Sequence, residues 1–143
     1  MIKLIVSFFT GITLFTSCVS DQRYSGSEAI KFEQYKFQGE QLYQALCMNC
    51  HQKDGTGLGK LIPPLNSKYL LNHKELAMCI IKNGMSGPIL VNDVTYNGTM
   101  PANPKLTPLE IAEIMTYIGN SWSNDIGMVT TQEVTQNLTK CNN

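Results

Sequence analysis

The stretch CMNCH, residues 47–51, decides how the rest of this sequence is interpreted. It holds two cysteines three positions apart, with a histidine directly after the second. Four kinds of site contain such a cluster: a covalently held cofactor, a bound metal ion, a redox-active thiol pair, or a chance cluster in an apolar core. The sequence around the stretch helps to separate them.

Three of these alternatives are disfavoured. A thioredoxin-type CxxC opens a helix after a β-strand, whereas Cys47 follows a predicted helix over residues 35–46. A structural zinc site commonly takes four ligands from two close pairs. The other candidate ligands, His73, Cys79 and Cys141, form no second close pair, so zinc stays open without support from spacing. A chance cluster is disfavoured because three chemically specific residues occupy five positions.

The pattern C-x-x-C-H is typical of a c-type haem attachment site. Two thiols add across the two vinyl groups of one porphyrin, so they must lie about one helical turn apart. A histidine directly after the second thiol then reaches the iron as an axial ligand. The stretch therefore predicts one covalent haem c, held by Cys47 and Cys50, with His51 on the iron.

Length and composition agree with a small cofactor-holding domain. The chain has 143 residues, enough for one modest domain with tails. Lys and Arg number 11, equal to Asp and Glu, so charge gives no reason to expect nucleic acid binding. The predicted helices are short and the loops long, so a haem would supply core that the chain itself lacks.

The N-terminus predicts export. Residues 1–17, MIKLIVSFFTGITLFTS, contain an apolar run that is too short for a bilayer, which needs about 18 to 25 residues, but suits a signal peptide. The F-T-S-C stretch at residues 15–18 resembles the lipobox of bacterial lipoproteins, in which the cysteine is acylated. We therefore expect lipidation of Cys18 and a periplasmic, membrane-anchored protein, with ordinary signal cleavage as the alternative. Residues 18–33 are polar and predict a flexible tether.

Two later helices have clear end signals. Asn72 as N-cap and Glu75 at N3 predict a helix that ends at Gly84. Thr107 as N-cap and Glu110 at N3 predict a second capping box. An apolar face at helical spacing follows it, formed by Ile111, Ile114, Met115, Ile118 and Trp122.

The remaining segments are predicted to be less regular. The stretch between the two helices, residues 86–105, is rich in Gly, Pro and Asn and predicts a loop with a short hairpin. Residues 124–143 are predicted to be a polar tail with one short helix that brings Val134 and Leu138 together.

The second axial ligand is predicted to be Met100. It lies in YNGTMPANPKL, where Gly98 permits a turn and Pro101 restricts the backbone after the sulfur. Met85 is the alternative loop methionine. His73 is expected at the solvent-exposed start of a helix and is not predicted to bind iron.

Residues 34–123 resemble the class I c-type cytochromes. Gly39 and Tyr43 precede Cys47 as in the N-terminal helix of that family, where the glycine allows a close crossing with the C-terminal helix. Ile114 and Tyr117 resemble the C-terminal side of that crossing. The resemblance implies an all-α fold, with three or more short helices and long loops around one covalent haem.

The same resemblance implies further site residues. After His51, the loop KDGTGLGKLIPPL resembles the family segment in which a proline carbonyl accepts a hydrogen bond from the ligand histidine. Pro63 is the expected counterpart, and its bond would orient the ring. The glycines of this loop lack a preceding strand and a following GK[ST], so a phosphate-binding loop is disfavoured.

The C-terminal half resembles a bacterial subgroup with MPA, a capped helix and an N-S-W segment. Members are periplasmic carriers or cytochrome subunits of larger oxidoreductases. The resemblance implies an electron carrier without catalytic residues or a small-molecule substrate, whose partners are redox proteins of a respiratory chain. Lys53 and Lys60 would form a weakly positive docking rim. The alternatives are a subunit of a larger complex and a peroxidase-like haem enzyme with an open sixth position.

Two cysteines are left after these assignments. In an oxidising compartment, Cys79 and Cys141 could form a disulfide that pins the tail to the second helix. The alternative is a buried Cys79 on an apolar helix face and a free Cys141.

Overall fold

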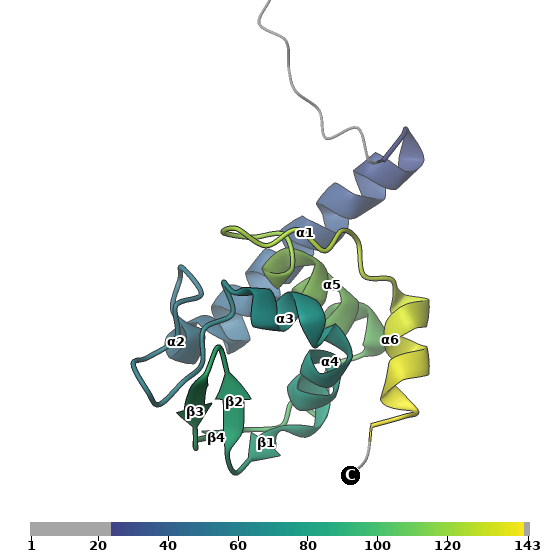
Figure 1. The fold of residues 1–143 in the computed structure, drawn as a ribbon. Coiled ribbons are helices and arrows are strands. Elements are labelled where there is room, and N and C mark those ends of the chain that lie inside the picture. The colour runs from purple at the N-terminus through teal and green to yellow at the C-terminus, as the bar shows by residue number, and fades with distance from the viewer. Residues whose placement is uncertain (1–23, 142–143) are drawn as a thin grey trace, which may run out of the picture.

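The computed structural model describes residues 24–141. Helices enclose a central region on most sides, and two short antiparallel strand pairs close it at one edge (Figure 1). The elements in chain order are α1 (Ser27–Leu46), α2 (Met48–His51), α3 (Lys68–Asn72), α4 (Lys74–Asn83), β1 (Met85–Ser86), β2 (Ile89–Val91), β3 (Val94–Tyr96), β4 (Thr99–Met100), α5 (Pro108–Ile118) and α6 (Thr131–Leu138). The predicted all-α class is confirmed.

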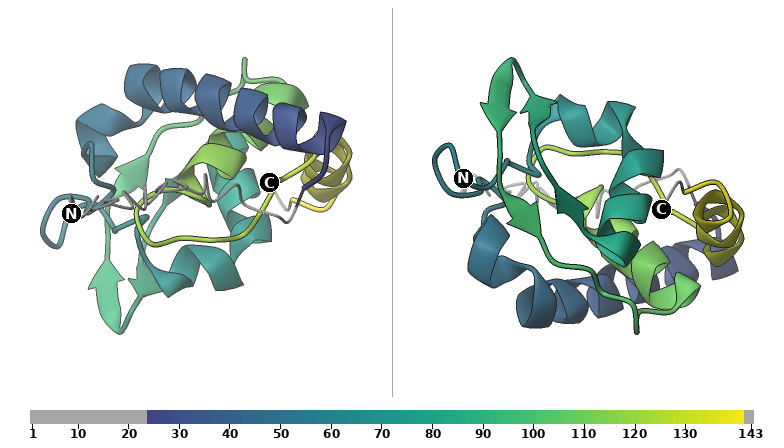
Figure 2. Two further views of the ribbon diagram at one scale, coloured as in Figure 1. Left: turned by 90° about the horizontal axis from the view of Figure 1, so that it is seen from above. Right: turned by 90° about the horizontal axis from the view of Figure 1, so that it is seen from below.

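The expected crossing of the first and last long helices is present. α1 runs along one side of the domain and packs against α5 (Figure 2). Gly39 lies directly against the α5 backbone, where a Cβ atom would meet the carbonyl of Glu113 and the Cβ of Tyr117. One turn further, the Tyr43 ring lies 5.4 Å from the Tyr117 ring, between centroids.

The tether prediction is wrong for residues 27–33, because α1 begins at Ser27. Its first half is held by distant contacts: Phe32 is buried and stacks on Tyr24, with ring centroids 4.9 Å apart. The Tyr24 hydroxyl accepts a hydrogen bond from the Met128 backbone amide at 2.6 Å. Polar composition alone did not reveal these contacts. The proposed signal peptide and Cys18 lie outside the described residues.

The predicted capping box of the last long helix is confirmed. The Thr107 side chain accepts from the Glu110 amide, and the Glu110 carboxylate accepts from the Thr107 amide at 2.7 Å. Trp122, however, does not continue the apolar face. α5 ends at Ile118, and Trp122 has φ of 60° and donates from Nε1 to the Lys53 carbonyl at 3.2 Å.

The start of the second predicted helix is wrong by one residue. Asn72 ends α3 instead of capping α4, and His73 stands between the two helices without a side-chain cap. The reason is that residues 68–72 are already helical, so Asn72 lacks the extended conformation of an N-cap. The predicted end is right, since Gly84 follows α4 with φ of 74°.

The strands form two small hairpin-like pairs. β2 pairs with β3, and the two residues between them, Asn92 and Asp93, both have positive φ, as a type I′ turn requires. β1 pairs with β4, so that Met85 and Met100 are direct cross-strand partners. The hairpin expected between residues 86 and 105 is therefore accompanied by a second strand pair.

The C-terminal tail belongs to the fold and is not a separate appendage. α6 packs against α4 and α5, with Val134 fully buried. Lys74 and Glu133 form an ion pair at 2.6 Å between α4 and α6. Of the two alternatives for the spare cysteines, the structure has the disulfide, which joins Cys79 on α4 to Cys141. Across residues 24–141, no helix combines the length and apolarity needed to cross a bilayer.

Candidate haem site

The structure brings the sequence-predicted haem residues to one cavity. Its wall includes Cys47, Cys50, His51, Pro63, Met85 and Met100. These residues come from the α1–α2 junction, the following loop and the β1–β4 pair. Most of the remaining wall is aliphatic: Leu61, Ile62, Leu65, Leu70, Ala77, Ile80, Ile81, Ile89, Val91, Ile114 and Ile118. A flat apolar ring fits such a wall, because burial against aliphatic side chains removes it from water.

The two thiols lie one helical turn apart at the cavity. Cys47 caps the end of α1, and the single turn of α2 carries Cys50 and His51. The His51 amide donates to the Cys47 carbonyl at 2.9 Å, which closes that turn. Both thiols are free, Cys50 exposed and Cys47 half-buried. Burial, with a smaller contribution from Cys50, raises the pKa of Cys47 to about 11, so this thiol is protonated at neutral pH.

His51 is buried and oriented. Its Nδ1 lies 3.2 Å from the Pro63 carbonyl oxygen, the predicted partner. A carbonyl can only accept, so Nδ1 carries the hydrogen and Nε2 is left as the ligand atom. Burial lowers the pKa of His51, while the bond to Pro63 acts in the opposite direction. The neutral imidazole that a metal requires is therefore the favoured form at neutral pH.

A tight loop aims the Pro63 carbonyl at His51. The Gly57 amide donates to the His51 carbonyl at 3.1 Å. Gly57 has φ of 71°, and a Cβ atom there would collide with the carbonyl oxygens of Ile62 and Pro63. The glycine thus serves close backbone packing, in agreement with the loop-geometry interpretation of this segment.

Both candidate methionines reach the cavity because they face each other across the β1–β4 pair. Met100 also packs against the buried core. The chain after Met100 is fixed to α4 by Asn103. The Asn103 side chain donates to the Ile81 carbonyl, and the Asn103 backbone amide donates to the Lys82 carbonyl, both at 3.2 Å. The choice of Met100 over Met85 stays a prediction.

Sequence reasoning did not place the polar side chains of Tyr69, His73, Tyr96 and Thr99 in the wall. Tyr96 is buried at the end of β3. His73 is exposed, as expected, but it also borders the cavity. For His73 the available signal was its spacing to Ala77 and Ile81, since residues four apart share a helix face and His73 directly precedes α4. Within the described part of the chain, no three His, Cys, Asp or Glu side chains gather as a metal-ligand group.

Comparison with known proteins agrees with this geometry. A family model described as "Cytochrome c" matches residues 38–122. A cytochrome c-552 of Thermus thermophilus is 31% identical over 91 residues, which cover 60% of this chain and 69% of that protein.

A second relative is much longer than this chain. The cytochrome c subunit of a quinone alcohol dehydrogenase from Gluconacetobacter polyoxogenes is 31% identical over 103 residues. The match covers 68% of this chain but only 22% of that protein. Together with the fold and the CMNCH site, the family match shows that the chain belongs to the cytochrome c family, as a class I c-type cytochrome with one covalently attached haem c.

Proposed function

We propose that this protein carries single electrons between respiratory oxidoreductases, as a carrier and not an enzyme. The observation that carries the proposal is the shared apolar cavity of Cys47, Cys50, His51 and Met100. Cys47 and Cys50 would hold the haem, and His51 and Met100 would bind its iron. The haem supplies a reversible one-electron couple when bound.

The protein's contribution is to keep the ligands in place and water out. His51 is held by Pro63, and the segment after Met100 is held by its bonds to α4. Fixed ligands need little rearrangement when the iron changes its charge. A His/Met ligand pair also gives a higher reduction potential than two histidines. The aliphatic wall would raise the reduction potential further, because limited solvent access favours the less charged state of the haem iron.

The location of the carrier is also part of the proposal. The apolar run and the lipobox-like end of residues 1–18 support export and acylation of Cys18. Two or more acyl chains would give a durable anchor, since a single chain binds only marginally. The anchor would hold the domain at the periplasmic face of a bacterial membrane, near membrane-bound oxidoreductases.

Partner docking is proposed at the surface beside the attachment loop. Lys53 and Lys60 are exposed there, as are Leu58 and Leu61, which are 51% and 67% exposed. Apolar contact with a few positive charges suits a brief encounter with an acidic partner. The similarity to a dehydrogenase cytochrome subunit supports the alternative of a fixed subunit. A test of whether the purified protein is monodisperse on its own distinguishes a free carrier from a fixed subunit.

Absorption spectra of the holoprotein test the function. We expect haem that survives acid–acetone extraction, sharp reduced bands, and the weak far-red sulfur–iron band of the oxidised protein. Met100→Ala should abolish the far-red band, while the matched Met85→Ala should keep it. The reverse pattern would move the ligand to Met85. A high-spin spectrum that shifts with carbon monoxide would favour the haem enzyme, and extractable haem would contradict attachment at Cys47 and Cys50.

Cell fractionation tests the anchor. The full-length chain should sediment with membranes, and Cys18→Ser should release the protein without changing its spectrum. A Cys18→Ser protein that stays fully membrane-bound would contradict lipid anchoring at this residue.

A further inference from the structure

The side of α1 that faces away from the domain exposes two large apolar side chains. Ile30 and Phe37 are 63% and 61% exposed. They lie two helical turns apart, on the opposite side of the helix from Gly39, which is buried against α5. Phe37 is the one aromatic among the exposed large apolar side chains of residues 24–141. We call this surface the outer face of α1, and a shallow depression on it is lined by Ala29, Ile30, Glu33, Gln34 and Phe37.

The outer face has no excess of charge. Residues 30–44 of α1 carry two positive side chains, Lys31 and Lys36, and two negative ones, Glu33 and Glu40. A strongly charged protein partner therefore gains little electrostatic attraction here. What remains is apolar attraction, so the occupant of this face must accept apolar side chains without charge complementarity.

A second copy of the chain is a poor occupant. A stable protein interface buries about 800 Å² on each partner. Ile30 and Phe37 with their small neighbours form a patch of roughly a few hundred Å². A membrane surface has no such minimum area, because each apolar side chain that enters the boundary between headgroups and acyl chains adds to the binding.

The proposed lipid anchor brings the outer face to a membrane. α1 begins at Ser27, close after Cys18 in the sequence. A chain extends by at most about 3.5 Å per residue, so the distance from Cys18 to Ser27 is no more than about 30 Å. Tethering at this range gives an effective concentration in the millimolar range, at which a weak contact between α1 and lipid is still well populated.

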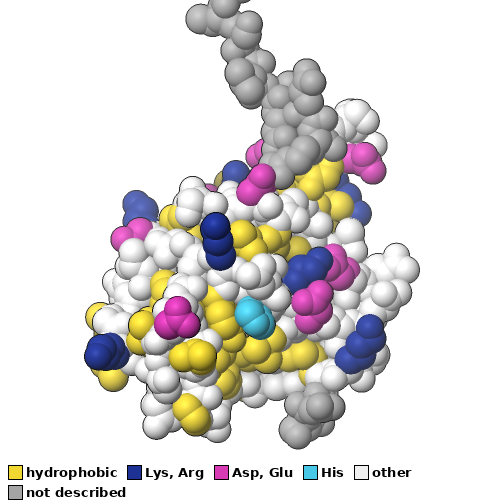
Figure 3. Space-filling model, viewed as in Figure 1, with side chains coloured by type: hydrophobic (Ala, Val, Ile, Leu, Met, Phe, Trp, Pro, Cys, Tyr) yellow, Lys and Arg dark blue, Asp and Glu magenta, His cyan; other side chains and the backbone are white. Residues whose placement is uncertain are grey.

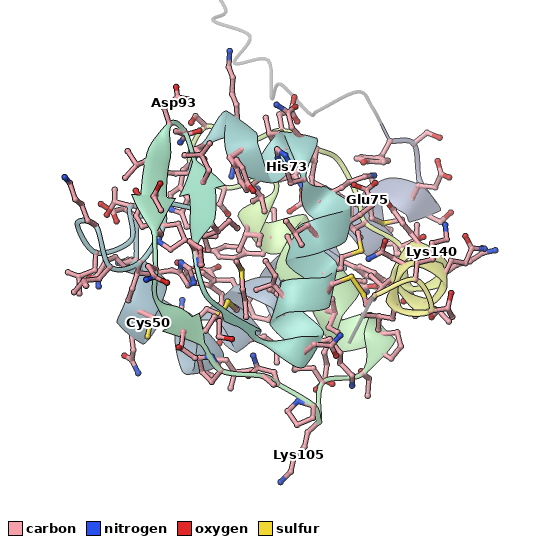
Figure 4. The ribbon with its side chains drawn as sticks, turned by 60° about the horizontal axis from the view of Figure 1, so that its bottom comes forward. Cys50, His73, Glu75, Asp93, Lys105 and Lys140 are labelled. Carbon is pink, nitrogen blue, oxygen red and sulfur yellow. A yellow bond between two sulfur atoms is a disulfide. The ribbon has the colours of Figure 1, made fainter. Side chains whose placement is uncertain are left out.

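The outer face and the elements around the cavity lie on opposite sides of the domain. Both views of Figure 2 place α1 on one side and the β2–β3 pair on the other. Figure 3 shows that hydrophobic side chains also reach the surface on the side opposite α1. In Figure 4, α4 and the β2–β3 turn, with the labelled Glu75 and Asp93, lie in front of α1. A surface that contacts α1 from outside therefore leaves the opposite side free.

We propose that the outer face of α1 rests on the membrane surface, with Ile30 and Phe37 inserted at the level of the headgroups and upper acyl chains. The inference rests on the proposed anchor at Cys18. Lys31 and Lys36 lie at the two flanks of the face, from which their long side chains reach the lipid phosphates. The domain is then held in one orientation, with α3, α4 and the β2–β3 pair turned toward solution.

Fluorescence quenching of the anchored holoprotein tests the proposal. A fluorophore is attached at Gln34→Cys, within the outer face, and the protein is reconstituted into phosphatidylcholine vesicles with brominated acyl chains. An interfacial helix face is buried by about 5–10 Å, so we expect quenching about fivefold stronger than for the same label at Asp93→Cys, on the opposite side. Quenching should be equal at low and high salt, because the face has no net charge.

Apolar substitutions provide the matched comparison. A double Ile30→Gln, Phe37→Gln variant should reduce quenching at position 34 to the level at position 93. Its absorption spectrum and its sedimentation with the vesicles should be unchanged, because both side chains are exposed and the anchor is kept. Leu90→Gln is the control, since Leu90 of β2 is 58% exposed but lies on the other side of the domain, and it should keep the native quenching.

Three results would overturn the proposal. One is equal quenching at positions 34 and 93 in a protein that stays with the vesicles. The second is a double variant with native quenching. The third is a dimer of the Cys18→Ser protein that dissociates in the double variant, which would assign the outer face to a second copy. A native protein that does not stay with the vesicles would contradict the anchor itself, so the failure of the anchor and the failure of the docking are distinguishable.

Discussion

Gly39 of α1 and Glu113 of α5 lie so close that any side chain at position 39 would overlap the Glu113 carbonyl. The overlap is with backbone, which cannot swing aside as a flexible side chain can. The position explains why the crossing needs glycine, even though glycine inside a helix costs about 1 kcal/mol relative to alanine. The close approach brings Tyr43 and Tyr117 together next to the cavity.

Gly39→Ala should therefore destabilise the protein, against the usual helix preference. We expect a loss of about 3 kcal/mol in the free energy of unfolding, because the two helices must separate. Urea unfolding of the holoprotein measures this. Gln38→Ala, at the exposed neighbouring position, should change stability by less than about 0.5 kcal/mol. Equal stability of the two variants would show that the crossing tolerates a side chain.

Two glycines of the loop after His51 separate backbone strain from steric collision. Gly57 and Gly59 both have positive φ, but only Gly57 is packed against other backbone atoms. Gly59→Ala should cost about 1–2 kcal/mol from the left-handed conformation alone. Gly57→Ala should cost at least about 3 kcal/mol, because it also displaces Pro63.

The same glycine pair has a spectroscopic readout. If the Pro63 carbonyl orients His51, Gly57→Ala should lose histidine ligation at a higher pH during acid titration than Gly59→Ala does. The absorption spectrum follows the loss. Identical acid titrations for both variants would mean that the loop does not support the ligand histidine.

The Cys79–Cys141 disulfide should stabilise the fold through its long loop. The cysteines are 62 residues apart, for which the chain-entropy account gives about 4 kcal/mol. A double Cys79→Ser, Cys141→Ser protein should lose up to this amount in urea unfolding. The haem spectrum should be kept, because Val134 burial and the Lys74–Glu133 pair still hold α6 in place.

A reducing agent provides the control for that prediction. It should lower the stability of the native protein to that of the double variant and leave the double variant unchanged. If the native protein is insensitive to reductant and equals the double variant, the disulfide does not form in solution.

The capping box of α5 predicts a pH-dependent contribution to stability. Hydrogen bonds from the Thr107 amide and then its hydroxyl lower the pKa of Glu110 below its ordinary value. A carboxylate with a lowered pKa contributes stability that is present above the unfolded pKa, near 4.5, and is lost as pH falls through the folded pKa. Glu110→Gln should cost about 0.5 kcal/mol at pH 7 and progressively less below pH 4.5.

Urea unfolding at a series of pH values checks this trend. Glu28→Gln is the matched control, since Glu28 is also in a first turn but α1 has no side-chain cap. Its effect should be smaller than that of Glu110→Gln at pH 7. A gap between native protein and Glu110→Gln that widens toward low pH would contradict the assigned sign.

The sequence by itself determined the features that depend on neighbouring residues. Residues 47–51 indicated the haem attachment site, and Thr107 with Glu110 indicated the start of α5, because a helical turn joins positions three or four apart. The resemblance to a known family added the distant pair His51 and Pro63, which local spacing could not provide.

Only the tertiary structure decided which distant residues share a surface. It showed that α1 begins at Ser27, because Phe32 is buried and Tyr24 bonds to Met128. It paired Met85 with Met100 and placed the exposed His73 at the cavity. The physical reason is that packing energy depends on contacts between segments far apart along the chain, and no periodicity or cap signal within one segment reports them.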